Sequence, residues 1–181
     1  MKLVILDRDG VINEDSDAYI KSPEEWNPIP GSLEAIARLN RHGYRVAVAT
    51  NQSGVARGLF TLDTLARIHR RMLEAVRDKG GEIDAIFFCP HGPDDDCLCR
   101  KPAPGLYEEI ADRLKTSLDN VYAVGDSERD LVAARAAGAQ PVLVRTGKGV
   151  RTLRKSKQLG DAPVFDDLAG FTDALVTDQL D

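Results

Sequence analysis

Two aspartates near the N-terminus have a spacing that suits a site for a cation or a transferable proton. Asp7 and Asp9 follow the apolar run 3–6 directly, and Gly10 comes next. Two carboxylates two residues apart at the end of a strand can reach one small volume, and the glycine lets the chain turn away sharply. Because close carboxylates repel each other unless a cation or a shared proton relieves them, this pair predicts metal binding or acid–base chemistry.

Polar residues follow other apolar runs in the same way. The segment 50–54 offers hydroxyl, amide and backbone donors, and Lys101 adds a positive charge before Pro102. Asp126 follows a further apolar run, and Asp130 lies one helical turn later. An isolated aspartate after a strand is more often a turn or capping residue, but four such elements in order favour a functional site. The oxygen ligands that this site would offer suit Mg²⁺; they are Asp7, Asp9 and Asp126.

All three cysteines lie within one short segment and are joined there by a histidine. Their pattern is Cys-x-His followed by Cys-x-Cys, and an odd number of cysteines argues against a disulfide framework. Four such ligands complete a closed tetrahedral zinc site, whereas catalytic zinc needs an open position. A zinc deaminase would need a His-x-Glu motif, which is missing around His91. Buried reduced cysteines that bind no metal are the simpler alternative. We predict a structural zinc that ties down the loop 89–102; its ligands are Cys89, His91, Cys97 and Cys99.

Apolar runs alternate with helical patterns along the chain. We expect strands at 2–6, 44–49, 83–88, 121–124 and 141–144, and helices at 32–43, 61–80, 104–114 and 128–137, with a last helix after 167. Ser32 is the expected cap of the first helix. This alternation predicts an α/β fold, a doubly wound parallel sheet in one domain over 1–181. Long segments at 13–30, 52–60 and 89–102 begin at the carboxyl ends of strands, where such sheets bind ligands.

Composition and charge restrict the classes of partner. The chain has 181 residues, 43% hydrophobic and 29% charged, and its net charge of −5 disfavours a general nucleic-acid binder. The apolar run near the N-terminus is too short for a signal peptide or a membrane span. We expect a cytoplasmic monomer with no membrane partner. The basic stretch 151–157 is typical of a solvated face.

The order Asp-x-Asp-Gly, Thr-Asn, Lys-Pro and Gly-Asp-x3-Asp, which spans 7–130, resembles the haloacid-dehalogenase-like phosphatases. The strings at 6–13, 50–54 and 99–102 are similar to those of the heptose bisphosphate phosphatases, whose subfamily also holds histidinol-phosphate phosphatases. The resemblance implies a haloacid-dehalogenase-like Rossmannoid core. Only about 40 residues separate Asp7 from Thr50, which leaves no room for a separate cap domain, so the long loops must shape the pocket.

The resemblance also implies a role for each motif. Asp7 would be the nucleophile that forms an aspartyl phosphate, and Asp9 the general acid and base. Magnesium would be held by Asp7, Asp126 and the backbone carbonyl of Asp9. The transferred phosphoryl group would be stabilised by Thr50, Asn51 and Lys101, with Asp130 orienting the lysine. The residues expected to contact the substrate are Asp15, Tyr19, Gln52, Ser53 and Arg100, with Lys148 as a further candidate for a distal phosphate.

These roles imply a magnesium-dependent phosphatase that removes the C7 phosphate of a heptose 1,7-bisphosphate, in the synthesis of nucleotide-activated heptose for lipopolysaccharide core. A histidinol-phosphate phosphatase is the main alternative. A polynucleotide 3′-phosphatase would favour a basic groove and would not need the zinc loop. An alternative that is not an enzyme is a zinc-stabilised interaction module with vestigial motifs. The presence of the full set of motifs disfavours it.

Overall fold

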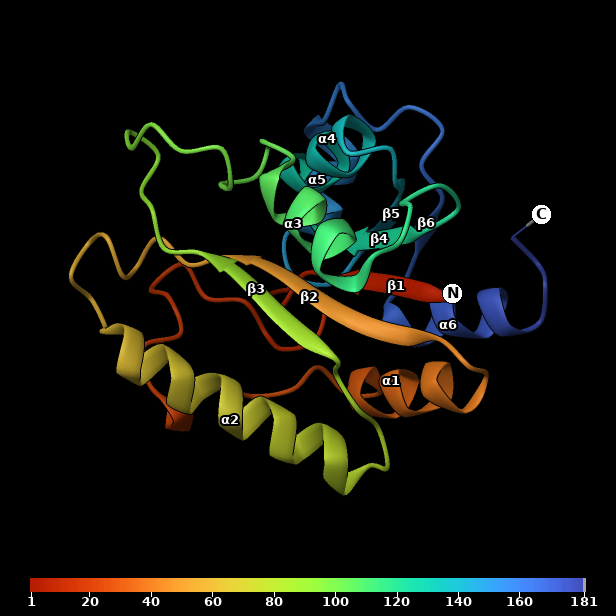
Figure 1. The fold of residues 1–181 in the computed structure, drawn as a ribbon, viewed down its shortest axis with the longest axis horizontal. Coiled ribbons are helices and arrows are strands. Elements are labelled where there is room, and N and C mark those ends of the chain that lie inside the picture. Colours follow the sequence, from red (N-terminus) through yellow and green to blue (C-terminus); the bar gives the residue numbers. More distant parts are fainter. Residues whose placement is uncertain (181) are drawn as a thin grey trace.

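The computed structural model describes residues 1–180, which are built around one sheet of six parallel strands. The strand order is β3-β2-β1-β4-β5-β6, with β1 and β4 adjacent at the centre (Figure 1). In the register of these strands, Leu6 lies beside Val48 on one side and Val124 on the other. The bounds are β1 Leu3–Leu6, β2 Arg45–Asn51, β3 Ala85–Cys89, β4 Tyr122–Gly125, β5 Gln140–Val144 and β6 Val164–Phe165.

Helices cover both faces of the sheet (Figure 1). One face carries α1 (Ser32–Arg41), α2 (Leu62–Asp78) and α6 (Leu168–Val176), and the other carries α3 (Gly105–Leu114), α4 (Glu128–Ala136) and α5 (Gly149–Lys155). Alternation along β1 explains the two layers, because Val4 and Leu6 join the first core and Leu3 and Ile5 the second. The predicted doubly wound α/β fold is confirmed.

Some local predictions were wrong or incomplete. Gly31, in a left-handed conformation, precedes α1, and the hydroxyl of Ser32 instead donates to the carbonyl of Val11 at 2.8 Å, so Ser32 is not the cap. The short elements α5, β6 and a 3₁₀ turn at Pro23–Glu25 were not predicted. Although 151–157 is mostly exposed, Thr152 is buried and donates to the carbonyl of Asp126 at 2.8 Å. No helix within residues 1–180 is both long and apolar enough to cross a membrane.

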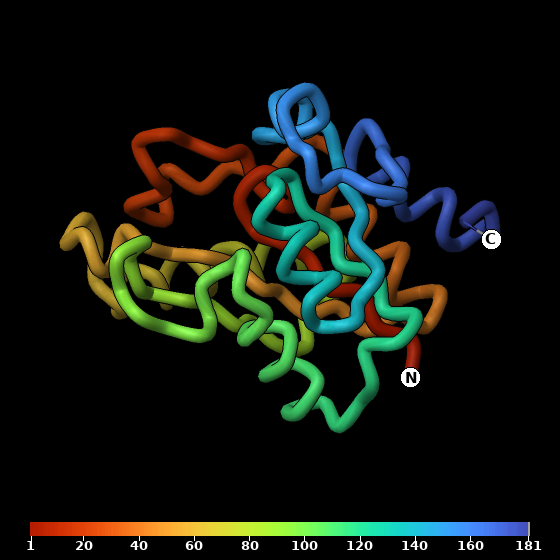
Figure 2. The backbone as a smooth tube through the Cα atoms, turned by 90° about the horizontal axis from the view of Figure 1, so that it is seen from above, coloured from red at the N-terminus to blue at the C-terminus, as the bar shows by residue number. Residues whose placement is uncertain are grey.

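The three long segments gather on one side of the molecule. Seen from above, the segments 13–30, 52–60 and 89–102 lie on the same side of the molecule (Figure 2). Since all six strands are parallel, residues that follow β1, β2 and β4 are brought to this same edge. The fold therefore places every predicted motif around one region.

Candidate active site

A buried lysine links two of the predicted aspartates. Lys101 is 2% exposed, and its Nζ lies 3.1 Å from Asp7 Oδ1 and 2.6 Å from Asp130 Oδ1. Its third partner is the carbonyl of Ala49, 2.8 Å away. Burial opposes the charge of Lys101, but Asp130 and Asp7 outweigh it and raise the lysine pKa. Likewise burial opposes ionisation of Asp130, whose pKa is nevertheless lowered by Lys101. Asp130 thus contacts the group that it is expected to orient.

Asp126 enters the same region from the end of β4. Its Oδ2 accepts a hydrogen bond from the backbone of Lys148 at 2.8 Å. Two glycines make room for this carboxylate: a Cβ on Gly10 would lie 2.0 Å from Asp126 Oδ2, and one on Gly147 would lie 2.3 Å from it. Both glycines have positive φ, at 84° and 56°. The backbone on two sides of Asp126 therefore requires glycine for both shape and space.

The carboxylates at this edge suit a hard cation. Ligand oxygens of Asp7, Asp126 and Asp130 lie within 4.8 Å of one another. Burial, reinforced by neighbouring carboxylates, raises the pKa of Asp7 to about 7, and burial and Asp130 raise the pKa of Asp126. Both oxygens of Asp130 are already engaged, by Lys101 and by Ser127. Asp7 and Asp126 are therefore the side chains that each have a carboxylate oxygen available for a metal ion. The negative charge of these carboxylates fits Mg²⁺.

Asp9 lies in a separate hydrogen-bond network. Its Oδ1 accepts from Arg8 Nε and from Asn13 Nδ2, each at 2.9 Å, and its Oδ2 accepts from Gln52 Nε2 at 3.1 Å. Burial alone would raise the pKa of Asp9, but the charge of Arg8 and these hydrogen bonds hold that pKa below its usual value. Asp9 is therefore a carboxylate at neutral pH, with Oδ2 as its less occupied oxygen.

Residues at the end of β2 hold the backbone of Lys101 in place. Asn51 Oδ1 accepts from the backbone of Lys101 and Asn51 Nδ2 donates to its carbonyl, each at 3.0 Å. Thr50 is buried, and its hydroxyl accepts from Gln52 Nε2 at 2.9 Å. Gln52 was predicted to contact substrate, and its amide also joins Thr50 to Asp9. The side chain of Asn51 thus has a structural contact beside the predicted role of its backbone.

A cavity of about 400 Å³ opens over these groups. Its lining includes every residue that was expected to contact the substrate, namely Asp15, Tyr19, Gln52, Ser53, Arg100 and Lys148. Lys148 Nζ lies 3.3 Å from Asp15 Oδ2, which ties the end of the sheet to the first long segment. Arg100 donates to the backbone carbonyl of His91 at 3.3 Å.

Two further arginines in the cavity wall were not predicted. Arg57 and Arg129 line it together with Arg100. Burial and the charges of Arg129 and Arg57 lower the pKa of Arg100, so the three guanidinium groups are electrostatic neighbours. Arg57 lies in the segment 52–60 and Arg129 comes three residues after Asp126. The one sequence signal for these two arginines was their position after the end of a strand. This signal was too weak to identify them, because arginine is common on exposed loops.

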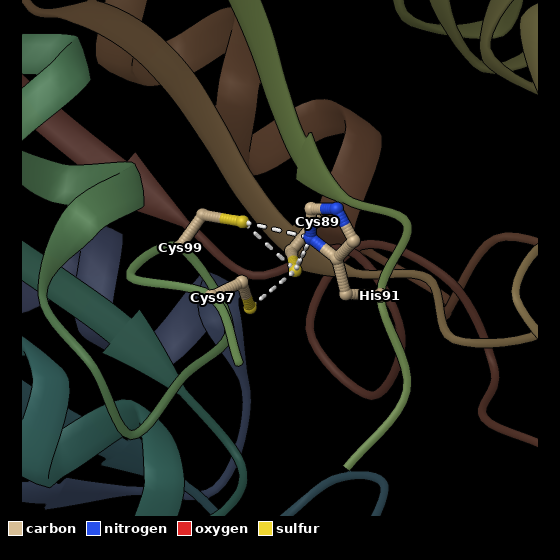
Figure 3. Close-up of side chains that lie close together, drawn as sticks. All are labelled: Cys89, His91, Cys97 and Cys99. Carbon is tan, nitrogen blue, oxygen red and sulfur yellow. Dashed lines mark hydrogen bonds between the residues drawn. The ribbon is translucent and has the colours of Figure 1, made fainter. Parts of the chain in front are cut away.

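The cysteine-rich loop converges on one point (Figure 3). His91 Nδ1 lies 3.4 Å from Cys89 Sγ and 3.3 Å from Cys99 Sγ, and Cys89 Sγ lies 3.7 Å from Cys97 Sγ and 3.0 Å from Cys99 Sγ. Sulfur ligands around tetrahedral zinc, with Zn–S of about 2.3 Å, stand roughly 3.8 Å apart. Burial and the neighbouring thiols of Cys89 and Cys97 raise the pKa of Cys99 to about 12. The donor set fits a zinc ion, and the Cys89–Cys97 distance matches the tetrahedral spacing, whereas the Cys89–Cys99 distance is shorter than it.

Comparison with known proteins identifies the family. The HAD-hydrolase-like family model matches residues 98–171. A D-glycero-beta-D-manno-heptose-1,7-bisphosphate 7-phosphatase of Pseudomonas putida is 57% identical over 97% of this chain and 100% of its own length. This chain belongs to the heptose-bisphosphate phosphatase family of HAD-like hydrolases. The family member from Bordetella bronchiseptica is 56% identical over 97% of this chain and 98% of its own.

Solved structures of the family share the fold closely. The D,D-heptose 1,7-bisphosphate phosphatase of B. bronchiseptica, complexed with magnesium and phosphate, superimposes with a TM-score of 0.96 at 55% identity, covering 98% of this chain and 99% of that one. The heptose-bisphosphate phosphatase of Burkholderia thailandensis has a TM-score of 0.78 at 45% identity over 98% and 99% of the two chains. The resemblance inferred from the motifs is confirmed.

Proposed function

We propose that this chain is a magnesium-dependent phosphatase that removes the C7 phosphate of D-glycero-β-D-manno-heptose 1,7-bisphosphate. The observation that carries the proposal is the 57% identity to a phosphatase of that name across its whole length. The site supports the same chemistry, because Asp7, Lys101 and Asp126 lie at a cavity that is also lined by guanidinium groups. The product would feed the synthesis of nucleotide-activated heptose, and we propose a cytoplasmic monomer.

Asp7 is the proposed nucleophile. Its carboxylate would attack phosphorus, the bond to the sugar oxygen would break, and an aspartyl phosphate would form. Lys101, held by Asp130 and Ala49, would stabilise the negative charge of the phosphoryl oxygens together with Thr50 and the backbone amide of Asn51. When bound by Asp7, Asp126 and the carbonyl of Asp9, Mg²⁺ supplies positive charge that allows an anionic nucleophile to approach an anionic phosphate.

Asp9 is the proposed proton carrier. In the first half-reaction it would protonate the departing sugar oxygen, and in the second it would accept a proton from the water that attacks the aspartyl phosphate. The low pKa of Asp9 in the free protein means that it begins as a carboxylate. The negative charge of a bound phosphate raises the pKa of a neighbouring carboxyl, so substrate binding favours the acid form that the first step needs.

The basic wall of the cavity is the proposed site for the second phosphate. Arg100 offers a forked guanidinium, and Arg57 and Arg129 add charge beside it. Asp15, Tyr19 and Ser53 offer partners for sugar hydroxyls. Histidinol phosphate carries an amine and an imidazole in place of a second phosphate, so this basic wall disfavours it.

The cysteine-rich loop is the proposed structural zinc site. Cys89, His91, Cys97 and Cys99 would fill all four positions of a tetrahedral ion and leave none open for a water. Arg100 and Lys101 follow the last ligand directly. The zinc would therefore act on catalysis only by fixing the loop that carries these two cations.

The substrate proposal is tested by comparing turnover on both anomers of heptose 1,7-bisphosphate, on a heptose monophosphate and on histidinol phosphate, each with Mg²⁺. We expect the highest kcat/KM for the β-bisphosphate. A higher kcat/KM for histidinol phosphate would overturn the substrate assignment and leave the phosphatase chemistry in place. No turnover of any phosphate ester would overturn both.

A further inference from the structure

A buried polar chain lies behind Asp9, on the side away from the cavity. Arg8 stands between the two catalytic aspartates in sequence, is 0% exposed and is absent from the cavity lining. Its Nε donates to Asp9 Oδ1 at 2.9 Å, and its Nη2 forms an ion pair with the same oxygen at 2.8 Å. At the other end of the guanidinium, Nη1 lies 3.2 Å from His69 Nε2.

His69 comes from a distant part of the chain. It lies on α2, 61 residues from Arg8, and is itself buried, with 7% exposure and its ring centroid 6.0 Å from that of Phe88 on β3. The side chain of Arg8 has Asp9 and His69 as its hydrogen-bond partners among the described residues. His69 therefore supplies the partner that Asp9 cannot supply for the far end of a fully buried guanidinium.

The chemistry of the two side chains fixes the direction of this contact. An arginine has five N–H donors and no acceptor, so His69 Nε2 must be the acceptor and must carry no proton. The buried setting agrees, since burial and the charge of Arg8 lower the pKa of His69 to about 3. His69 is thus a neutral acceptor throughout the physiological pH range.

This arrangement restricts Asp9. Arg8 and Asn13 together occupy Asp9 Oδ1, while Asp9 Oδ2 has Gln52 as its hydrogen-bond donor. Asp9 lines the cavity, and Oδ2, which has a single donor, is the oxygen left for proton exchange. Nη2 of Arg8 is already buried without a hydrogen bond and has only its ion pair with Asp9. Without an acceptor at position 69, Nη1 would be buried and unsatisfied as well, and the guanidinium would lose the contact that fixes its far end.

Resting on the proposed function of Asp9 as proton carrier, we propose that His69 is a positioning residue for proton transfer. It holds Arg8, and Arg8 holds Asp9 so that Oδ2 exchanges the proton with the leaving oxygen. His69 touches neither substrate nor phosphate, and acts on the reaction through two side chains.

The test uses two substrates that differ in their need for an acid. A sugar alkoxide must be protonated as it leaves, whereas nitrophenolate is a good leaving group without a proton. The ratio kcat/KM covers the steps up to the first P–O cleavage, so it excludes the later hydrolysis of the aspartyl phosphate. We expect His69→Leu to lower kcat/KM for heptose bisphosphate about tenfold or more, and for nitrophenyl phosphate less than about twofold.

Three further variants make the result specific. His69→Gln keeps an acceptor oxygen and is expected to restore most of the sugar phosphate activity. Met72→Ala opens the core on the same helix without touching Arg8, and should affect both substrates equally. If His69→Leu does not fold, His69→Phe, which keeps a ring against Phe88 but has no acceptor, replaces it.

An equal loss on both substrates, or no loss on either, would overturn the positioning role. If the wild-type protein hydrolyses another alkyl phosphate but not heptose bisphosphate, the substrate proposal fails. The comparison of that alkyl phosphate with nitrophenyl phosphate then still decides the role of His69.

Discussion

Replacing Asp7 with asparagine should have opposite effects on activity and on stability. Turnover should be abolished, because an amide cannot attack phosphorus to form the acyl phosphate. The metal-free protein should at the same time become more stable at alkaline pH. Both effects follow from the same carboxylate, which is buried beside Asp130 and Asp9 and is only partly compensated by Lys101.

The size and sign of the stability effect follow from the raised pKa of Asp7. The unfolded chain releases this proton near pH 3.8, whereas the folded chain retains it up to about pH 7. Folding stability therefore falls as the pH rises through this interval, and the full cost is present above it. A gap of about three pKa units corresponds to at most about 4 kcal/mol. Because Lys101 loses a partner in the variant, we expect a gain of about 1–3 kcal/mol at about pH 8.

Urea denaturation of EDTA-treated wild type and Asp7→Asn, at about pH 5 and about pH 8, measures this difference. At the lower pH only about a third of this cost is present, because the unfolded carboxyl is already ionised while the folded one is still protonated. The lost contact with Lys101 offsets this part, so the two proteins should be nearly equally stable there. Adding Mg²⁺ at about pH 8 should stabilise the wild type, by about 2.7 kcal/mol at a hundredfold excess over Kd, and the variant much less. An Asp7→Asn variant that is less stable at the higher pH, or a stability difference that does not change with pH, would refute the electrostatic reasoning. Activity above a few per cent would refute the nucleophile assignment.

The remaining predictions concern the other parts of the site. Asp9→Asn should lower kcat by about 10²–10⁴-fold with an unchanged circular dichroism spectrum, and a loss below about tenfold would contradict its proton-transfer role. Arg100→Ala should raise KM for heptose bisphosphate roughly 10- to 150-fold and raise it much less for a monophosphate; equal shifts would assign the arginine to the reacting phosphate or to the fold. Elemental analysis should find one zinc per chain and less in Cys97→Ser, while wild type without zinc would contradict the metal assignment. Gly147→Ala, which places a Cβ 2.3 Å from Asp126 Oδ2, should raise the Mg²⁺ concentration needed for half-maximal activity about tenfold or more, and an unchanged Mg²⁺ dependence would show that this close approach is not needed.

The parts of the fold that follow from short-range patterns were predictable. The solid apolar runs of β1 and β4 identify buried parallel strands, and the aspartates after them must then meet at one edge. The element α5 was missed because it has only seven residues, begins with glycine and includes three basic residues, which is typical of a solvated segment. Its anchor, the buried hydroxyl of Thr152, depends on the position of the Asp126 carbonyl, which no local pattern encodes.

Long-range contacts within the site were not predictable for a similar reason. The sequence favours a packing or surface role for a histidine on a helix, and nothing near His69 indicates that it meets Arg8. The same holds for Arg57 and Arg129, because the course of the loops decides which arginines face the cavity. Motif spacing finds groups that chemistry requires, whereas supporting contacts depend on the whole three-dimensional packing.

The central place of β1 in the sheet also bears on how the protein becomes active while it is being synthesised. A nascent chain that has emerged as far as α3 holds β1, β2, β3 and the complete cysteine-rich loop, with Asp7 and Lys101 available to each other. Asp126 and Asp130 emerge only afterwards, and they reach the site when β4 adds to the free edge of β1. Until that step, Lys101 lacks its shortest ion pair and one of the two free carboxylates for the cation is missing. A ribosome-bound chain should therefore gain phosphatase activity abruptly, at the length that lets β4 dock, however well its N-terminal half has already folded.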